Sequence, residues 1–157
     1  MINPFSQYLA EVFEQPYPLR VLKTSGGGKN ATDIIYTAKT DGGDLIEIEF
    51  SQWGGKERWR IDFSVNKTVQ MTGAGKPWRI LATVLQAIRQ FMEWHKKNVG
   101  TDKDPYPQVF VVSASGISRY KAYTAMIRRF AHTYGYRIGS IFDDSDLDET
   151  NITLERR

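Results

Sequence analysis

Hydrophobic and polar residues alternate along three consecutive segments in the first half of the chain. In the third segment, Trp59, Ile61 and Phe63 alternate with charged or small polar residues. A period of two residues places successive side chains on opposite faces of a strand. Glycine-containing turn signals separate the segments. The pattern predicts an antiparallel meander that is buried on one face, with strands at Ile34–Lys39, Leu45–Gln52 and Arg58–Val65.

The period changes to 3.6 residues after this meander. An apolar stripe that includes Leu81, Leu85 and Ile88 predicts a long helix beginning at Pro77. Three more elements are predicted after this helix. A continuous apolar run predicts a buried strand, a second apolar stripe predicts a helix that ends before Gly135, and a last alternation predicts another strand. In chain order they are a strand at Val109–Val112, a helix at Ser118–Tyr134 and a strand at Tyr136–Phe142. The expected class is therefore α+β, a mixed sheet with helices packed on it.

The two ends of the chain give weaker signals. Residues 1–32 predict a short helix at Pro4–Phe13, a strand at Leu19–Lys23 and a glycine loop at Ser25–Asn30. Residues 143–157 predict an acidic C-terminal tail, in which Ile152–Leu154 pairs only briefly. At 157 residues, one domain over 1–157 is the expectation.

Composition excludes several kinds of chemistry. With no cysteine and only two histidines, the chain has no disulfides, no thiolate nucleophile and no histidine-rich metal cluster, so we expect no metal cofactor. A net charge of +3 does not require a nucleic-acid partner. No apolar run reaches the length of a membrane span, and no secretory signal is visible. We therefore expect a cytoplasmic protein with no membrane partner.

The junction between the meander and the long helix carries two glycines one residue apart. Residues 70–78 read Gln-Met-Thr-Gly-Ala-Gly-Lys-Pro-Trp. Glycine lets the backbone approach a ligand without a Cβ in the way, and proline fits the first helical position, where no N–H is needed. The N–H groups at a helix N-terminus attract phosphate. The junction thus predicts a seat for a pyrophosphate-bearing ligand, although a plain tight turn explains the same glycines.

This order of elements resembles the GNAT superfamily of N-acetyltransferases. In that superfamily a strand runs into a pyrophosphate loop of the form Gln/Arg-x-x-Gly-x-Gly/Ala, and Gln70, Gly73 and Gly75 match it in register. The resemblance covers residues 33–140 and extends to small uncharacterised GNAT-like bacteriophage proteins. It implies helices packed on both faces of the sheet and a splayed central pair of parallel strands, with acetyl-CoA as the co-substrate. The residues that would bind its pyrophosphate are Gln70, Met71, Thr72, Gly73, Ala74, Gly75, Lys76 and Trp78.

The resemblance also implies catalytic roles. The pantetheine arm would lie between the end of a strand at Thr68–Met71 and the strand at Val109–Ser113, one of whose backbone N–H groups would polarise the thioester. Tyr123 would protonate the leaving thiolate. A carboxylate would take the proton from the attacking amine, and the options are Glu47, Glu49 and Asp62.

The same residues have ordinary structural explanations. Tyr123 lies in the apolar stripe of its helix and twelve residues before Gly135, which is farther than the superfamily spacing. The three carboxylates lie on the polar faces of their strands, where solvated acids are common. The region before the meander, where the superfamily carries substrate-binding helices, is short.

Three functions remain open on the sequence. The first is an acetyl-CoA-dependent N-acyltransferase, encoded by a phage and acting on an unknown amine. The second is a non-catalytic GNAT-like phage protein that serves as a virion component or binds a host factor; both place the chain in the host-cell cytoplasm or the virion. The third is a nucleic-acid binder that uses the basic side of the second helix, including Arg128 and Arg129. No interleaved aromatic residues support the third.

Overall fold

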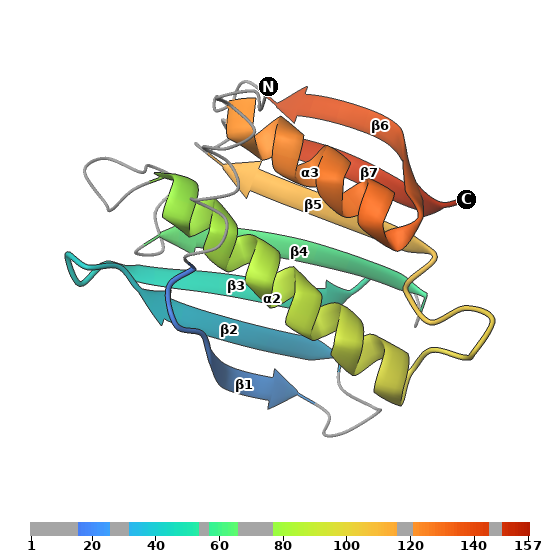
Figure 1. Cartoon of the computed structure of the whole chain (residues 1–157), viewed down its shortest axis with the longest axis horizontal. Helices are drawn as coiled ribbons and strands as arrows, with labels where there is room; N and C mark the ends of the chain where they lie inside the picture. Colours follow the sequence, from blue (N-terminus) through green and yellow to red (C-terminus); the bar gives the residue numbers. More distant parts are fainter. Residues whose placement is uncertain (1–15, 26–31, 54–56, 66–76, 116–120, 145–148) are drawn as a thin grey trace, which may run out of the picture.

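The computed structural model describes residues 16–25, 32–53, 57–65, 77–115, 121–144 and 149–157. Seven strands form one sheet in the order β1-β2-β3-β4-β5-β7-β6, and two helices pack on it (Figure 1). The strands are β1 (Arg20–Ser25), β2 (Asp33–Lys39), β3 (Leu45–Gln52), β4 (Arg58–Val65), β5 (Val109–Ser115), β6 (Tyr136–Asp144) and β7 (Glu149–Arg156). The helices are α2 (Pro77–Asn98) and α3 (Lys121–Tyr134). The architecture is a mixed α/β fold.

The predicted meander is confirmed. Strands β1 to β4 pair antiparallel in sequence order, and β3 and β4 have the bounds that the alternation predicts. Gly43 supplies the positive φ of 87° in the β2–β3 turn, and Gly135 supplies the φ of 76° that ends α3. The expected helix at Pro4–Phe13 and strand at Thr68–Met71 lie outside the described residues.

The chain then crosses from β4 through α2 to β5, and β5 pairs with β4 in parallel. The paired residues run from Arg58↔Val109 to Phe63↔Ala114. This is the one parallel pair among the described strands, because β5–β7 and β7–β6 are antiparallel. The partner of β5 on this side is therefore β4 itself. The expected partner at Thr68–Met71 lies outside the described part of the chain.

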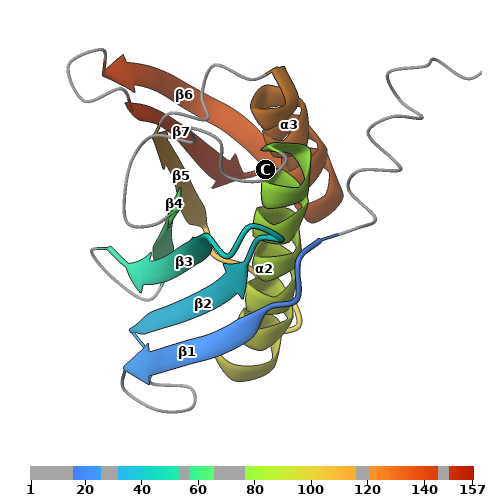
Figure 2. The ribbon, with the colours of Figure 1, turned by 90° about the vertical axis from the view of Figure 1, so that its left-hand side faces the viewer.

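Both described helices lie on the same face of the sheet (Figure 2). Phe110 of β5 contacts Phe91 of α2 and Phe130 of α3, with ring centroids 5.9 Å and 5.6 Å apart. One side chain can touch both helices only if they share a face. Helices on both faces are thus not confirmed, because an apolar stripe shows that a helix is covered but not which face of the sheet covers it.

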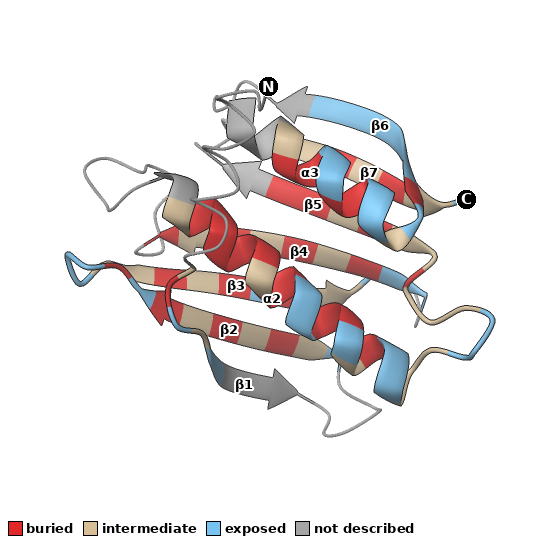
Figure 3. Cartoon of the chain, in the orientation of Figure 1, coloured by how far each residue is buried: buried red, intermediate tan, exposed pale blue. Residues whose placement is uncertain are grey.

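The core lies between this sheet face and the two helices (Figure 3). Phe91 is at its centre, fully buried, with its ring stacked on Phe50 at 4.4 Å and tilted against Trp59 at 4.9 Å. The inward residues of β2, β3 and β4 are the alternate apolar positions of the sequence. Their outward neighbours remain exposed or half-buried, which leaves a polar face opposite the helices.

The C-terminal residues differ most from expectation. Instead of a brief pairing inside a tail, residues 149–156 form β7, which lies inside the sheet between β5 and β6. Ile152 and Leu154 are buried under the helices, and the polar residues between them point to the other face. Six of the eight residues of β7 are polar, and for this reason the sequence alone predicted a solvated tail.

Tyr136 connects this end of the sheet to the loop before β5. Its side chain is 1% exposed, and its hydroxyl donates a hydrogen bond of 2.6 Å to the carbonyl of Pro107. Burial raises the pKa of the Tyr136 phenol far above its ordinary value of about 10, although the nearby Arg156 opposes this. The folded chain therefore keeps a proton that the unfolded chain releases at high pH.

Replacing Tyr136 by Phe has two expected effects on the free energy of unfolding. At neutral pH it falls by about 1 kcal/mol, because the Pro107 carbonyl loses its donor. Above a pH of about 10, wild-type stability declines as the unfolded phenol ionises, by up to about 1.4 kcal/mol per pH unit for each such group, and Tyr136→Phe declines less steeply. Urea unfolding across this range measures both. An unchanged slope in Tyr136→Phe would contradict the assignment.

Candidate functional site

The candidate site lies where β4, β5 and the first turn of α2 come together at one end of the sheet (Figure 1). Pairing between the two parallel strands ends at Phe63↔Ala114, whereas β4 continues to Val65. Their ribbons move apart toward these C-terminal ends. Ligands of α/β sheets bind beyond the carboxyl ends of parallel strands, next to a following helix N-terminus. This end of the sheet is therefore the place to look for a bound anion.

Helix α2 begins at Pro77, as predicted, and its first turn contains no acidic residue. Unpaired N–H groups and the macrodipole give a helix N-terminus a partial positive charge, which first-turn acids commonly neutralise. Here the first turn itself contributes no acidic side chain, and its one charged residue, Arg79, forms an ion pair with Asp41 from another element. The predicted phosphate contacts lie just before this turn. Residues 70–76 and the side chain of Trp78 are outside the described part of the chain.

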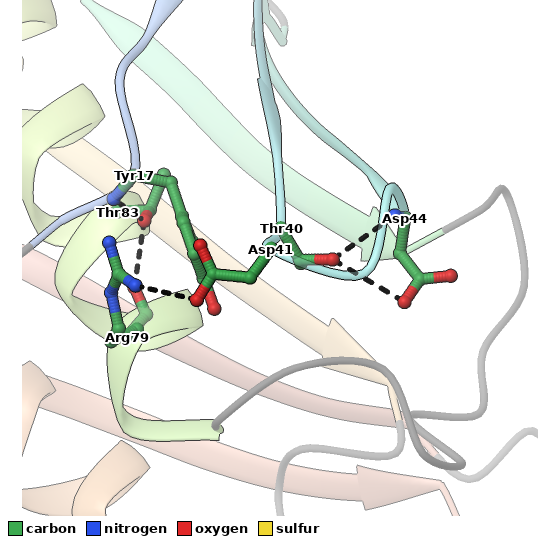
Figure 4. A network of polar contacts seen from close by, with 6 residues as sticks. All are labelled: Tyr17, Thr40, Asp41, Asp44, Arg79 and Thr83. Atoms are coloured by element: carbon green, nitrogen blue, oxygen red, sulfur yellow. Dashed lines mark hydrogen bonds and ion pairs between the residues drawn. The ribbon is translucent and has the colours of Figure 1, made fainter.

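Contacts of Arg79 and Thr83 attach this first turn to the rest of the fold (Figure 4). The Arg79 guanidinium lies 3.9 Å from the centroid of the Tyr17 ring and 3.0 Å from Asp41 in the β2–β3 turn. The Thr83 hydroxyl accepts a 2.9 Å bond from the Tyr17 N–H and donates one of 2.7 Å to the Arg79 carbonyl. The side chains of Arg79 and Thr83 thus fix the position of the start of α2. None of these residues was singled out from the sequence, because the pairs are far apart in the chain.

The Tyr17 hydroxyl is buried and makes no hydrogen bond to any residue that the structure describes. A buried polar group without a partner costs about 1–3 kcal/mol. We therefore expect Tyr17→Phe to leave the free energy of unfolding unchanged or to raise it. Thr83→Val, which has nearly the same shape, should lower it by a similar amount because the Tyr17 N–H loses its acceptor. Urea unfolding of the two variants measures the contrast, and a loss in Tyr17→Phe as large as in Thr83→Val would refute it.

The three candidate carboxylates lie on the face of the sheet opposite the described helices. Asp62 and Glu49 are directly opposite each other on β4 and β3, and Asp62 is also level with Ser113 of β5. Glu47 is opposite Ser64, beyond the last β4–β5 pair. Asp62 is therefore the carboxylate on the parallel pair itself, one position before the pairing ends. Its side chain is about half exposed and forms an ion pair with Arg60 at 3.2 Å.

Two polar residues that the sequence did not single out extend this row. Ser113 is 2% exposed, and its hydroxyl donates a hydrogen bond to the side-chain oxygen of Asn151 on β7. Glu49, Asp62, Ser113 and Asn151 thus lie level on four neighbouring strands. In the sequence, the signal for the place of Asn151 in this row is its alternation with the apolar Ile152. That alternation covers too few residues to predict that β7 lies beside β5.

Tyr123 lies in the first part of α3, on the other side of the sheet from the carboxylates. Its side chain is outside the described part of the structure. It shares a helical stripe with Ile127 and Phe130, both of which are buried against the sheet. α3 follows β5, so its start is at the same end of the sheet as the start of α2 (Figure 1). The fold therefore brings Tyr123 to the correct end of the sheet but gives no contact for its hydroxyl.

The expected thioester donor on β5 needs a correction. Residues 109–113 are paired with β4 on one side and with β7 on the other, so their backbone groups belong to the ladders of the sheet. A backbone N–H in the interior of a sheet has its acceptor already. Ser115 is the first β5 residue that is paired with β7 but not with β4. A backbone donor for the thioester would therefore come from Ser115 or beyond.

Other kinds of site find little support. Within the described ranges, no three histidine, aspartate or glutamate side chains gather as a metal site would require. Neither described helix combines the length and the apolar character that crossing a membrane needs. On the basic side of α3, Arg128 and Arg129 are exposed, whereas Arg137 is on β6 and forms an ion pair with Glu155 at 3.0 Å. The described basic residues therefore do not form one stripe along the helix.

Comparison with known proteins gives no family. No family model matches the chain, and no curated protein matches it. Among solved structures, the chain is similar to a "putative acetyltransferase" from Sphaerobacter thermophilus DSM 20745, over 98% of this chain and 88% of that one. The sequence identity is 10% and the TM-score is 0.43. At these values the likeness carries no conclusion about this chain, so its own geometry has to support any function.

Proposed function

We propose that the protein is an N-acyltransferase that uses acetyl-CoA and acts on an amine. The observation that carries the proposal is the parallel β4–β5 pair, which ends beside the start of a helix that lacks first-turn acids. The glycines of the GNAT-like motif, Gly73 and Gly75, lie in the connection between β4 and that helix. A pyrophosphate at this position would meet backbone N–H groups and the helix dipole.

The reaction would be a direct transfer between two bound reactants. The amine nitrogen attacks the thioester carbonyl, a C–N bond forms, the C–S bond breaks and the thiolate leaves. Asp62 is the carboxylate best placed to take the amine proton, because it is on β4 one position before the strands part. Tyr123 would return a proton to the thiolate. Holding both reactants in one cleft would supply much of the rate.

The role of Asp62 is testable by substitution. We expect Asp62→Asn to lower kcat/KM by about 100-fold, which is the lower range for the loss of a general base, without changing the affinity for acetyl-CoA. The assay measures free thiol released from acetyl-CoA in the presence of a panel of primary amines. Asp33→Asn is the matched control, because Asp33 is also on the face opposite the helices but two strands away from Asp62, on β2 and level with Arg60. Equal activity of the two variants would remove Asp62 from the mechanism.

The non-catalytic alternative gives a different result in the same assay. A GNAT-like protein that serves as a virion component or a host-factor binder would release no thiol with any amine. No contact among the described residues favours this role over the transferase. The phage origin and the cellular location remain predictions from the sequence resemblance.

A further inference from the structure

Strand β6 is the outer strand on one edge of the sheet, and among the described residues no strand pairs with its free side. All its residues from Arg137 to Phe142 are exposed. Three large apolar side chains of β6 face solvent, with exposed fractions of 37% for Ile138, 56% for Ile141 and 62% for Phe142. An exposed apolar edge is a template for pairing with another strand, and proteins commonly protect such edges with charges. On the opposite edge, β1 carries Arg20 and Lys23.

A bulge in β6 changes which of its exposed residues share a face. The pairing with β7 shifts between Ile138 and Ser140, so that Gly139 is an extra residue. As a result Ile138 and Ile141, three positions apart, both lie level with buried residues of β7 and share the helix-bearing face. In a regular strand, residues three apart point to opposite faces. The bulge therefore places both isoleucines on one face, although only two residues separate them.

A second copy of β6 can bring these exposed residues together in one register. If two β6 strands run antiparallel with the two-fold axis between Gly139 and Ser140, Ile138 of each copy is opposite Ile141 of the other. Arg137 is then opposite Phe142, and both lie on the face away from the helices. Directly opposite side chains of an antiparallel pair contact each other on the same face. This single register covers all three exposed apolar residues.

The charges of β6 are also self-complementary in this direction. Arg137 is near one end of the strand, and Asp143 and Asp144 are at the other. Antiparallel pairing brings the basic end of each copy to the acidic end of its partner. Parallel pairing would instead place like charges side by side, which is unfavourable.

From these features we propose that the protein forms a two-fold dimer through antiparallel pairing of β6 with β6 of a second copy, which joins the two sheets into one. The dimer would leave the candidate acyl-transfer site of each copy, on β4 and β5, away from the interface, because β7 and β6 lie between. This inference is independent of the proposed function.

The test is the mass of the full chain in solution, measured by sedimentation equilibrium across the micromolar range. The expected mass of the wild type is twice 18.0 kDa. Ile141→Lys should reduce it to that of one chain, whereas Val21→Lys, an equally exposed position on the opposite edge, should remain a dimer. A wild-type mass of 18.0 kDa throughout, or a dimer that Ile141→Lys does not change, would overturn the proposal.

A charge exchange and a disulfide cross-link test the register of the proposed β6–β6 pairing. They also test the dimer itself if Ile141→Lys does not fold. Asp144 lies on the same face as Arg137 and is diagonal to Arg137 of the other copy in this register. Arg137→Asp and Asp144→Arg should each weaken the dimer, and the two together should restore it. Because the chain has no cysteine, Ser140→Cys introduces a unique thiol close to the proposed axis. Mild oxidation should link Ser140→Cys into covalent dimers and leave Val21→Cys as single chains. Equal cross-linking of the two variants, or no restoration by the double variant, would contradict this pairing.

Discussion

Gly75→Glu is expected to abolish acetyl-CoA binding. The substitution places a carboxylate in the connection between β4 and α2, directly before the N-terminus at which we propose that the pyrophosphate binds. Like charges in close contact cost several kcal/mol. A loss of about 4 kcal/mol corresponds to about a 1,000-fold weaker affinity, which removes a micromolar complex from the measurable range. Isothermal titration of both proteins with acetyl-CoA measures the difference.

Val21→Glu is the matched control for the added charge. Val21 is 58% exposed on β1, the edge strand that lies three strands away from β4. We expect this variant to bind acetyl-CoA as the wild type does. Far-UV circular dichroism and urea unfolding establish that both variants are folded. Unchanged affinity in folded Gly75→Glu would place the coenzyme elsewhere.

Phe91→Ala is expected to cause the largest loss of stability among single substitutions in the core. The ring is fully buried and contacts aromatic side chains from β3, β4 and β5. Truncating a buried phenylalanine costs about 3–5 kcal/mol, because apolar burial is lost and a cavity remains. The total free energy of unfolding of a natural domain is only about 5–15 kcal/mol. Urea unfolding followed by tryptophan fluorescence measures the change, and the variant should be close to unfolding at physiological temperature.

The comparison for this prediction is Trp53→Ala. Trp53 is 52% exposed, and its described ring contact is with the Arg58 guanidinium at 5.6 Å. Removing an exposed side chain of this kind changes stability by less than about 1 kcal/mol. If Phe91→Ala lowered the free energy of unfolding by no more than Trp53→Ala does, Phe91 would not be the centre of the core.

The local elements could be predicted from the sequence because each depends on a short pattern. The alternation of β3 and β4 and the stripe of α2 result from side chains that are buried every second or every third to fourth residue. Gly135 ends α3 because its positive φ is easy for glycine. These features need no knowledge of the partner element.

The arrangement of elements could be predicted only in part. No local pattern indicates on which face of the sheet α3 packs. The contacts of Phe110 with both helices show that α3 packs on the same face as α2. The position of β7 depends on its pairing with β5, which is about forty residues away in the chain. Because six of its eight residues are polar, the segment resembles a solvated tail unless its pairing with β5 and β6 is known.

In the candidate site, too, some features follow from a local sequence pattern and others depend on contacts between distant residues. The helix start at Pro77 follows from proline and glycine chemistry. The row formed by Asp62, Ser113 and Asn151 depends on register between strands, which a single sequence does not encode locally. The contacts of Arg79 with Tyr17 and Asp41 likewise join residues that are far apart in the chain.

The most direct test of the central claim is an NMR titration of the isotope-labelled wild type with CoA. The account predicts saturable shifts of backbone amide signals, in the micromolar range, at Arg79 and Ile80 in the first turn of α2 and at Ser115 at the end of β5. Signals from the far end of the sheet, such as Asp102 in the loop after α2, should not move. No saturable change at millimolar CoA, or changes confined to that far loop, would contradict it.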